Sequence, residues 1–296
     1  HPLNRTPHLI AALKESMCKA GFPHYMLKEI HEQPQVVRDA LSGRWSGPDH
    51  SVTLPAFDQV LAALTPIEKI SFVACGTSYH AGCVGALWME ELARMPSYVE
   101  IASEYRYRNP VITPGTLTIA ISQSGETADT LAAVKESQQR KSPVLGLCNV
   151  EGSTLHREAD ATALLGAGME VSVASTKAFT SQMACLALIA IQLAERRGVD
   201  RQYLRAWKQE LGCMPDQIEQ VLELAPAIQA LARRWAHHER FFFVGRRHLV
   251  PVALEGALKL KEIAYVDACG YAAGELKHGP IALIDPESPT IALCAN

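Results

Sequence analysis

The sequence predicts an α/β fold: a doubly wound parallel sheet with helices on both faces, followed by a second, apparently truncated domain of the same type. Short apolar runs alternate with segments of helical spacing, which is the pattern of strand–helix–strand units. Polar loops follow several of the apolar runs, where parallel sheets place their ligand sites. With 48% hydrophobic and 20% charged residues, the composition is typical of a globular chain.

The regular alternation begins near residue 69. Strands and helices are expected, in chain order, at 70–74, 79–94, 117–121, 127–140, 144–148 and 176–197. The strands are almost wholly apolar, as strands buried on both faces of a parallel sheet are. Gly198 should end the last helix, because glycine readily adopts the left-handed conformation found after helix ends.

Three parts of the chain follow from this pattern. Residues 1–50 are expected to hold an N-terminal segment with a helix at 25–41, and residues 51–200 the first domain. Residues 201–296 are expected to hold helices, then a strand at 241–244, a helix at 251–262 and a strand at 290–293. This second unit is too short to complete a sheet and both ends of the chain look cut. We therefore expect a piece of a longer protein.

Charge and hydropathy exclude two classes of partner. The formal net charge is -3 and no run of Lys or Arg stands out, so we expect no nucleic-acid surface. The longest apolar run, 183–191, is shorter than the roughly 20 residues that a membrane span needs. No targeting segment is visible.

The cysteines and histidines give no pattern typical of a metal site. Eight cysteines occur without a CxxC pair, mostly among apolar residues, which predicts buried, reduced thiols and a reducing compartment. His237 and His238 are adjacent, and neighbouring residues on a helix do not face each other. We therefore predict no metal ion.

The loop after the strand at 117–121 is the best candidate for an anion site. Ser122, Gln123, Ser124 and Thr127 supply hydroxyls and an amide at the start of a helix, where unpaired N–H groups favour phosphate. Gly125 permits a tight turn. A simple turn with an N-cap is the alternative. No Lys of the GxxxxGK[ST] type is present, so a nucleotide triphosphate is disfavoured.

Two further polar loops fall on the same predicted edge. Cys75 to Ser78 follows the strand at 70–74, and Val173 to Thr176 precedes the helix at 176–197. Either loop alone is adequately explained as a turn or an N-cap. Three such loops at the carboxyl edge of one sheet favour a polar pocket.

Residues 254–280 are the richest in acid–base groups. Glu255, Lys259 and Glu262 are spaced four and three apart, so they share one helix face. A Glu beside a cation can shuttle a proton, although a solvated helix face with ordinary ion pairs is the alternative. His278 lies in a short loop, where most histidines are surface or structural groups.

Taken together, these segments are similar to a known family. Residues 75–82, 122–130, 173–180, 254–262 and 275–280 closely resemble the isomerase half of the glucosamine-6-phosphate synthases, the glutamine–fructose-6-phosphate aminotransferases. Residues 25–34 resemble the helix that joins the two halves of those enzymes. The resemblance runs in order from about Tyr25 to the end of the chain.

This resemblance implies two sugar isomerase domains and a pocket for fructose 6-phosphate or glucosamine 6-phosphate. The residues that it implies for binding are Ser122, Gln123, Ser124 and Thr127 on the phosphate, and Ser78, Val173 and Ser175 along the sugar.

For catalysis, the resemblance implies that Glu262 moves a proton between C1 and C2, with Lys259 assisting nearby. His278 would aid ring opening and reach the site from the neighbouring subunit. It further implies a cytoplasmic homodimer without metal or organic cofactor.

The chain departs from the whole enzyme at both ends. The glutamine-hydrolysing domain is missing, and so is the C-terminal tail with the lysine that forms a Schiff base with the ketose. We therefore expect no use of glutamine by this chain alone, and weak isomerisation at most.

Two alternatives to this enzyme remain open. A phosphosugar sensor of the same fold would need the phosphate loops but no proton shuttle, so Glu262 and the His278 loop favour an enzyme. A related amino-sugar deglycase or deaminase is the other alternative, and the match to the joining helix argues against it.

Overall fold

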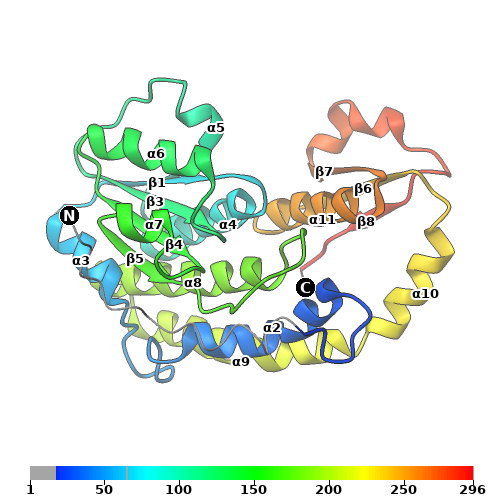
Figure 1. Cartoon of the computed structure of the whole chain (residues 1–296), viewed down its shortest axis with the longest axis horizontal. Helices are drawn as coiled ribbons and strands as arrows, with labels where there is room; N and C mark the ends of the chain where they lie inside the picture. The colour runs from blue at the N-terminus through cyan, green and yellow to red at the C-terminus, as the bar shows by residue number, and fades with distance from the viewer. Residues whose placement is uncertain (1–17, 65, 296) are drawn as a thin grey trace, which may run out of the picture.

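A five-stranded parallel sheet, in the order β2-β1-β3-β4-β5, forms the centre of the first domain (Figure 1). The computed structural model describes residues 18–64 and 66–295. The strands are β1 (Lys69–Ala74), β2 (Ser97–Ile101), β3 (Thr116–Ser122), β4 (Val144–Cys148) and β5 (Ala161–Leu164). All residues of β3 and β4 are buried, as expected for inner strands that are covered on both faces.

Helices cover both faces of this sheet, which confirms the predicted doubly wound architecture. One core holds side chains from α2 (Tyr25–Leu41), α3 (Pro55–Ala63), α4 (Gly76–Ala93), α8 (Lys177–Arg196) and α9 (Arg201–Leu222). The other core lies beneath α5 (Ala102–Tyr105), α6 (Ala128–Gln139) and α7 (Thr154–Glu158). The predicted helix at 25–41 is confirmed as α2.

Helix α8 is the central helix of the first domain. Fifteen of its 20 residues are buried. It packs closely on α4, because a Cβ atom at Gly85 would lie only 3.1 Å from Leu186 Cδ1. Among the described residues α8 alone has the length and hydropathy of a membrane-spanning helix, yet 78% of that window is buried inside the protein. Such burial is typical of the core helix of a globular domain.

A three-stranded parallel sheet, β7-β6-β8, forms the second unit. Its strands are β6 (Arg240–Gly245), β7 (Asp267–Ala272) and β8 (Thr290–Ala292), with the short helices η1 (Glu275–His278) and η2 (Pro280–Leu283) before β8. Helix α11 (Leu249–Ala264) packs on β6 and β7 and also against α4 of the first domain. Helix α10 (Ala225–Trp235) leads into this sheet and buries none of its residues.

The sequence analysis missed the strands β2, β5 and β7 and the short helices α3, α5 and α7, and it placed the starts of α4 and α11 too late. Strands β2 and β5 are edge strands. Strand β2 contains Ser97 and Glu100, and β5 is only four residues long, so neither has the long apolar pattern of an inner strand. Strand β7 contains Gly270, which lies too close to Leu254 for a side chain. Helix α4 begins at Gly76, three residues before the predicted start, so Ser78 lies in its first turn.

The cysteines are less buried than predicted. Only Cys148 and Cys185 are buried, whereas Cys18, Cys213 and Cys294 are exposed. The three exposed thiols lie near chain ends or on the solvent side of α9, where apolar neighbours in the sequence do not produce burial.

The division of the chain at residue 201 remains a prediction. Helix α9, which follows it, packs Leu204 and Leu211 into the first core.

Candidate functional site

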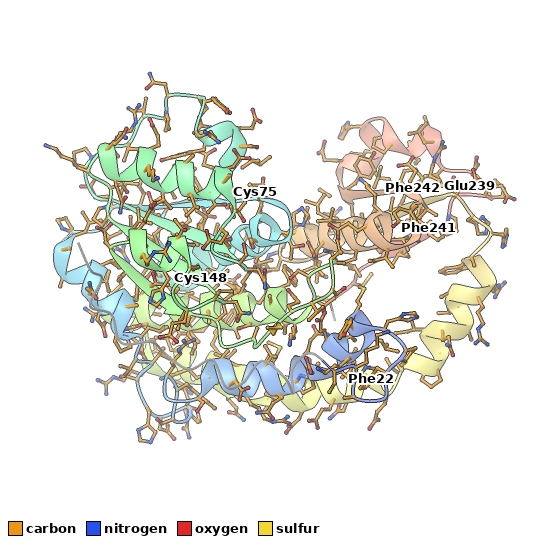
Figure 2. All side chains as sticks on the ribbon, in the orientation of Figure 1. Phe22, Cys75, Cys148, Glu239, Phe241 and Phe242 are labelled. Atoms are coloured by element: carbon orange, nitrogen blue, oxygen red, sulfur yellow. The ribbon has the colours of Figure 1, made fainter. Side chains whose placement is uncertain are left out.

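The polar loops predicted from the sequence meet at the carboxyl edge of the five-stranded sheet. Cys75 and Cys148, labelled in Figure 2, mark this edge at β1 and β4. Strand β3 lies between these two strands, with Val73 of β1 beside Ala120 and Cys148 of β4 beside Ser122. The loops that follow the three strands are therefore neighbours, which is where open parallel sheets bind ligands.

The loop after β3 has its hydroxyls arranged at the start of α6. Ser122 Oγ lies 3.0 Å from Thr127 Oγ1 and accepts a hydrogen bond of 3.0 Å from the Gly125 N–H. Ser124 Oγ accepts from the Glu126 N–H at 3.1 Å. Thr127 is the N-cap residue of α6, but its side chain caps no N–H group. The first turn of this 12-residue helix thus keeps N–H groups that can bind an anion.

Gly125 fixes the shape of this loop. Its φ of +68° lies in the left-handed region, and a Cβ atom there would lie 2.1 Å from Ser153 Oγ. Gly125 also accepts a hydrogen bond of 2.9 Å from the Leu155 N–H through its carbonyl oxygen. The segment that follows β4 therefore packs directly on the loop, and only glycine fits there.

Asn149, directly after β4, joins two of the loops and was not singled out from the sequence. Its N–H donates to the Gln123 carbonyl at 3.0 Å, and its side-chain amide donates to the Gly168 carbonyl at 2.5 Å. Its Oδ1 accepts from the Ala167 N–H at 2.8 Å. An Asn at the end of a buried strand was the available signal, since its side chain readily bonds neighbouring backbone.

Ser78 lies in the first turn of α4 and is almost fully buried. Its hydroxyl accepts a 2.9 Å hydrogen bond from Gln182 Nε2 on α8. The carbonyl oxygen of the Gln182 side chain is buried and has no hydrogen-bond partner in the described structure. Ser78 is thus held at the edge of the sheet, beside an unsatisfied acceptor.

The predicted sugar-lining residues Val173 and Ser175 belong to a loop at 166–176, between β5 and α8. Val173 is 96% exposed, which leaves its side chain accessible to a ligand or a partner. Ser175 Oγ donates to Glu170 Oε2 at 2.8 Å. No hydrogen bond between this loop and Ser122 or Thr127 occurs in the described structure; Asn149 provides the link through Gly168 and Gln123.

The acid–base residues of α11 form one network with α4. Lys259 Nζ lies 2.6 Å from Glu262 Oε2 and donates to Thr77 Oγ1 at 3.0 Å. Thr77 in turn donates to Glu255 Oε1 at 2.9 Å, and His80 Nδ1 lies 2.7 Å from Glu255 Oε2. The solvated-face alternative is therefore wrong for Glu255, whose side chain is only 7% exposed. Glu262 is half-buried at the rim.

Thr77 and His80 were missed as members of this network. Both lie within the segment at 75–82 that carried the family resemblance, but no spacing rule links a residue on α4 to one on α11. The pairing depends on how α11 packs on α4, and the two residues nearest in sequence that it joins across these helices, His80 and Glu255, are 175 positions apart.

His278 is not part of this network within the chain. It ends η1, is exposed, and makes no hydrogen bond or ion pair with the other residues that the structure describes. Its predicted role remains a prediction that requires a second subunit.

A hollow of about 1160 Å³ lies away from the polar loops, among α2, α8, α9 and α10. Its walls are mostly apolar and include Met183, Trp207 and Ile218. None of the predicted site residues lines it. An apolar wall without a cluster of charged groups is unsuited to a phosphorylated sugar, so the polar edge remains the candidate site.

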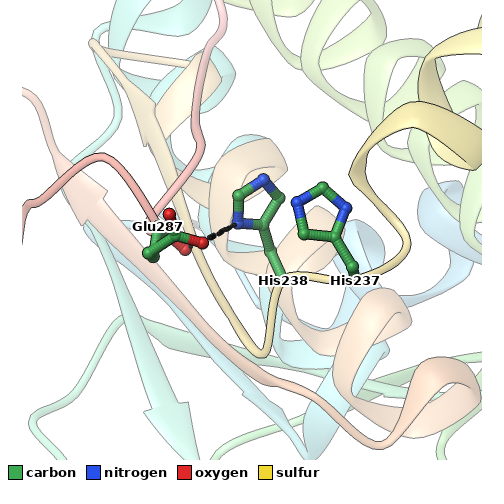
Figure 3. A group of neighbouring side chains, drawn as sticks. All are labelled: His237, His238 and Glu287. Carbon is green, nitrogen blue, oxygen red and sulfur yellow. Dashed lines mark hydrogen bonds and ion pairs between the residues drawn. The ribbon is translucent and has the colours of Figure 1, made fainter.

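His237 and His238 lie in the turn between α10 and β6 and not on a helix, so the geometric reason given for excluding a metal there is wrong. Their ring centroids are 4.0 Å apart. Figure 3 shows the two rings beside the Glu287 side chain. His238 Nδ1 lies 3.0 Å from the Glu287 carbonyl oxygen and 3.4 Å from its carboxylate. The Nδ1 proton is therefore engaged by the carbonyl, and the group lies at the opposite, amino end of β6.

The family model of the SIS domain matches residues 63–192 and 236–295. The chain belongs to the SIS-domain family. The two matched stretches cover the five-stranded sheet and the three-stranded sheet, respectively. Each stretch contains part of the candidate site. The hydroxyl loop, residues 122–127, lies in the first stretch, and Lys259 and Glu262 lie in the second.

Curated SIS-domain proteins resemble this chain over most of its length. It is 46% identical over 283 residues to the glutamine–fructose-6-phosphate aminotransferase (isomerizing) of Methanosarcina acetivorans, covering 95% of this chain and 46% of that protein. It is 48% identical over 276 residues to the Symbiobacterium thermophilum enzyme of the same name, covering 93% and 45%. The chain thus spans about half the length of these relatives.

A solved SIS-domain structure supports the same relationship. The C-terminal domain of glucosamine-fructose-6-phosphate aminotransferase from Francisella tularensis matches with a TM-score of 0.88 and 40% identity, covering 94% of this chain and 78% of that one. The chain is therefore homologous to the isomerase part of these aminotransferases, as the motifs indicated.

Proposed function

We propose that this chain binds fructose 6-phosphate at the polar edge of its first sheet and catalyses the proton transfer that converts a ketose phosphate into an aldose phosphate. The phosphate binds Ser122, Gln123, Ser124 and Thr127 at the start of α6. Ser78, Val173 and Ser175 line the sugar. The preformed hydroxyl loop supports this assignment because its geometry suits an oxyanion.

In the proposed reaction, the Glu262 carboxylate removes a proton from C1. The electrons of that C–H bond form the C1–C2 double bond, while the C2 carbonyl oxygen takes up a proton. Glu262 then returns its proton to C2, and the C1 hydroxyl loses its proton as the C1 carbonyl forms. Atoms and charge balance without an added oxidant or reductant. A positioned carboxylate is a suitable base for this transfer.

The observation that carries the proposal is the position of Lys259. Its ammonium group contacts Glu262 Oε2 on its own helix and Thr77 Oγ1 beside Ser78. The acid–base residues of the second unit are thereby held against the sugar-lining turn of the first domain. Lys259 can stabilise negative charge that develops on the enediol oxygens.

The proposal extends to the longer protein. The relatives are named as aminotransferases that use glutamine and fructose 6-phosphate. The complete protein would then form glucosamine 6-phosphate in the cytoplasm as a homodimer, with His278 of one subunit aiding ring opening in the other. No metal or organic cofactor takes part in these proposed steps.

The test combines binding with proton exchange. Fructose 6-phosphate at about 100 times its dissociation constant should raise the free energy of unfolding by roughly 2.7 kcal/mol. Incubation in D2O should then introduce deuterium at C1 or C2 of the sugar, and NMR measures the rate of this exchange. Glu262→Gln should keep binding and lose exchange at least a hundredfold, whereas the matched control Glu239→Gln, on an exposed residue far from the edge, should change neither.

Three results would overturn the proposal in different ways. Exchange at full rate in Glu262→Gln would exclude this residue as the base. Tight binding without exchange in the unsubstituted chain would favour the phosphosugar sensor. Release of ammonia from glucosamine 6-phosphate would favour the deaminase.

A further inference from the structure

We infer that Glu29, on helix α2, is a positioning residue for the proposed sugar site, because its buried carboxylate holds the backbone of the loop that carries Val173 and Ser175. This inference rests on the proposed function, since it concerns the shape of the same site. Glu29 lies outside the polar edge, and none of the proposed catalytic or binding roles uses it.

Glu29 is buried, with 2% of its surface exposed. Its Oε1 accepts a hydrogen bond of 2.6 Å from the Val171 N–H and one of 3.2 Å from the Ser172 N–H. Oε2 lies 3.4 Å from the same Ser172 nitrogen. Two consecutive amides thus converge on one carboxylate, which fixes the peptide units 170–171 and 171–172, shortly before Val173. A hydrogen bond to a charged acceptor is about twice as strong as a neutral one.

The loop itself has little other support at its centre. Residues 165–176 form no helix or strand, and Gly166 and Gly168 both have positive φ angles. One end is fixed by Asn149 through Ala167 and Gly168.

Glu170 fixes the other end of this loop. It accepts from Ser175 Oγ, from the Thr176 N–H at 2.8 Å and from the Ala178 N–H at 3.2 Å. Between these two anchors, the described contacts of the backbone at 171–172 are those with Glu29.

Neighbouring residues of α2 fix the helix that follows the loop. Glu32 Oε2 pairs with Lys177 Nζ at 2.8 Å, and Lys177 is only 4% exposed. Thr180 donates to Gln33 Oε1. Helix α2 therefore contacts both the loop and the first turns of α8, and the Glu29 carboxylate is the group on α2 that accepts hydrogen bonds from the Val171 and Ser172 N–H groups. A substitution at Glu29 should therefore affect the loop backbone, whereas a substitution elsewhere on α2 should affect only the packing of the helix.

The experiment compares Glu29→Gln with Val37→Ala. Val37 is also buried on α2 and packs in the main core, so its truncation destabilises the helix without touching the loop. Glu29→Gln keeps the side-chain volume and one acceptor oxygen but removes the charge. Both proteins are first compared by urea unfolding, and binding is measured under conditions where each is folded.

Three readouts separate the roles. For Glu29→Gln we expect amide exchange at Val171 and Ser172 to become at least tenfold faster, and the dissociation constant of fructose 6-phosphate to rise about tenfold. The dissociation constant of inorganic phosphate should stay within twofold, because the loop at 122–127 does not contact Glu29. Val37→Ala should leave all three values within twofold of those of the unsubstituted chain. Glu29→Asp tests whether a carboxylate on a side chain one methylene shorter recovers part of the affinity for fructose 6-phosphate that Glu29→Gln loses.

The outcomes distinguish this inference from the proposed function. If Glu29→Gln behaves like Val37→Ala, or weakens inorganic phosphate as much as the sugar, the positioning role is wrong while the proposed site stands. If the unsubstituted chain binds neither inorganic phosphate nor fructose 6-phosphate, the proposed site is wrong and this inference falls with it.

Discussion

His80 Nδ1 lies 2.7 Å from Glu255 Oε2, and this contact joins helix α4 of the first domain to helix α11 of the second unit. The Glu255 carboxylate is buried, so loss of its partner leaves a buried charge less well compensated. His80→Ala should lower the free energy of unfolding by about 1–3 kcal/mol. Urea unfolding followed by circular dichroism measures this change.

The control for this prediction is His237→Ala, since His237 is exposed and lies away from the contact of α4 with α11. It should alter stability by less than about 0.5 kcal/mol. Equal losses for both substitutions would show that the contact between His80 and Glu255 contributes nothing specific.

Gly125 and Gly152 offer a matched pair of substitutions. Both have positive φ, at +68° and +76°, so alanine is strained at either position. A Cβ atom at Gly125 would lie 2.1 Å from Ser153 Oγ, whereas nothing lies within 4 Å of one at Gly152. Gly152→Ala should cost about 1–2 kcal/mol from backbone strain alone.

Gly125→Ala should cost more, because the loop must also move away from Ser153. We expect at least a tenfold rise in the dissociation constant of inorganic phosphate for Gly125→Ala and no more than twofold for Gly152→Ala. Isothermal titration measures both. An unchanged constant in Gly125→Ala would place the phosphate elsewhere.

The two buried cysteines should differ in reactivity from the three exposed ones. Burial raises the pKa of the Cys148 and Cys185 thiols, which lowers the fraction of reactive thiolate. Cys18, Cys213 and Cys294 are exposed. A thiol reagent at pH 8 should modify these three within minutes, and peptide mass spectrometry should find Cys148 and Cys185 modified only after denaturation. Rapid labelling of Cys185 in the native protein would contradict its placement in the core.

The inner part of the fold was predictable because local pattern and burial agree there. Strand 144–148 was predicted with the bounds that the structure gives, since β4 is wholly apolar and wholly buried. The bounds of helix 25–41 were also correct, although its apolar residues are only loosely periodic. Edge strand β2 was missed because Ser97 and Glu100 leave it without a continuous apolar run. Short edge strands depend on pairing with a neighbour, which a local pattern does not encode.

The candidate site was predictable in its loops but not in its connections. The hydroxyls of Ser122 and Thr127 follow from a polar loop between a strand and a helix. The contact of Lys259 with Thr77 joins residues 182 positions apart and depends on the packing of α11 on α4. The role of Glu29 was likewise not predictable from the sequence. It lies on a helix among charged neighbours, as a surface residue would, and it is buried only by the tertiary packing of that helix. Buried polar groups that serve distant backbone carry little local signal.

Glu32 should make a contribution to stability that depends on pH. Burial by itself raises the pKa of Glu32, but hydrogen bonds and charges from Lys177 and Lys28 outweigh it and hold the pKa below its ordinary value of 4.5. A lowered pKa in the folded state means that the unfolded chain binds the proton more readily. The stabilisation is therefore present above pH 4.5 and is lost as the pH falls through the folded pKa.

Glu32→Gln tests this pH dependence. Because about a third of the Glu32 side chain is exposed and solvent screens its ion pairs, the loss at pH 7 should be no more than about 1 kcal/mol. The difference in unfolding free energy between the two proteins should stay constant from pH 8 to about pH 6 and shrink below pH 4.5. Urea unfolding at each pH provides the measurement. In a Lys177→Met background, Glu32→Gln should lower the free energy of unfolding by less at neutral pH than it does in the unsubstituted chain. A difference that persists unchanged to pH 3 would show that Glu32 acts through packing and not through its charge.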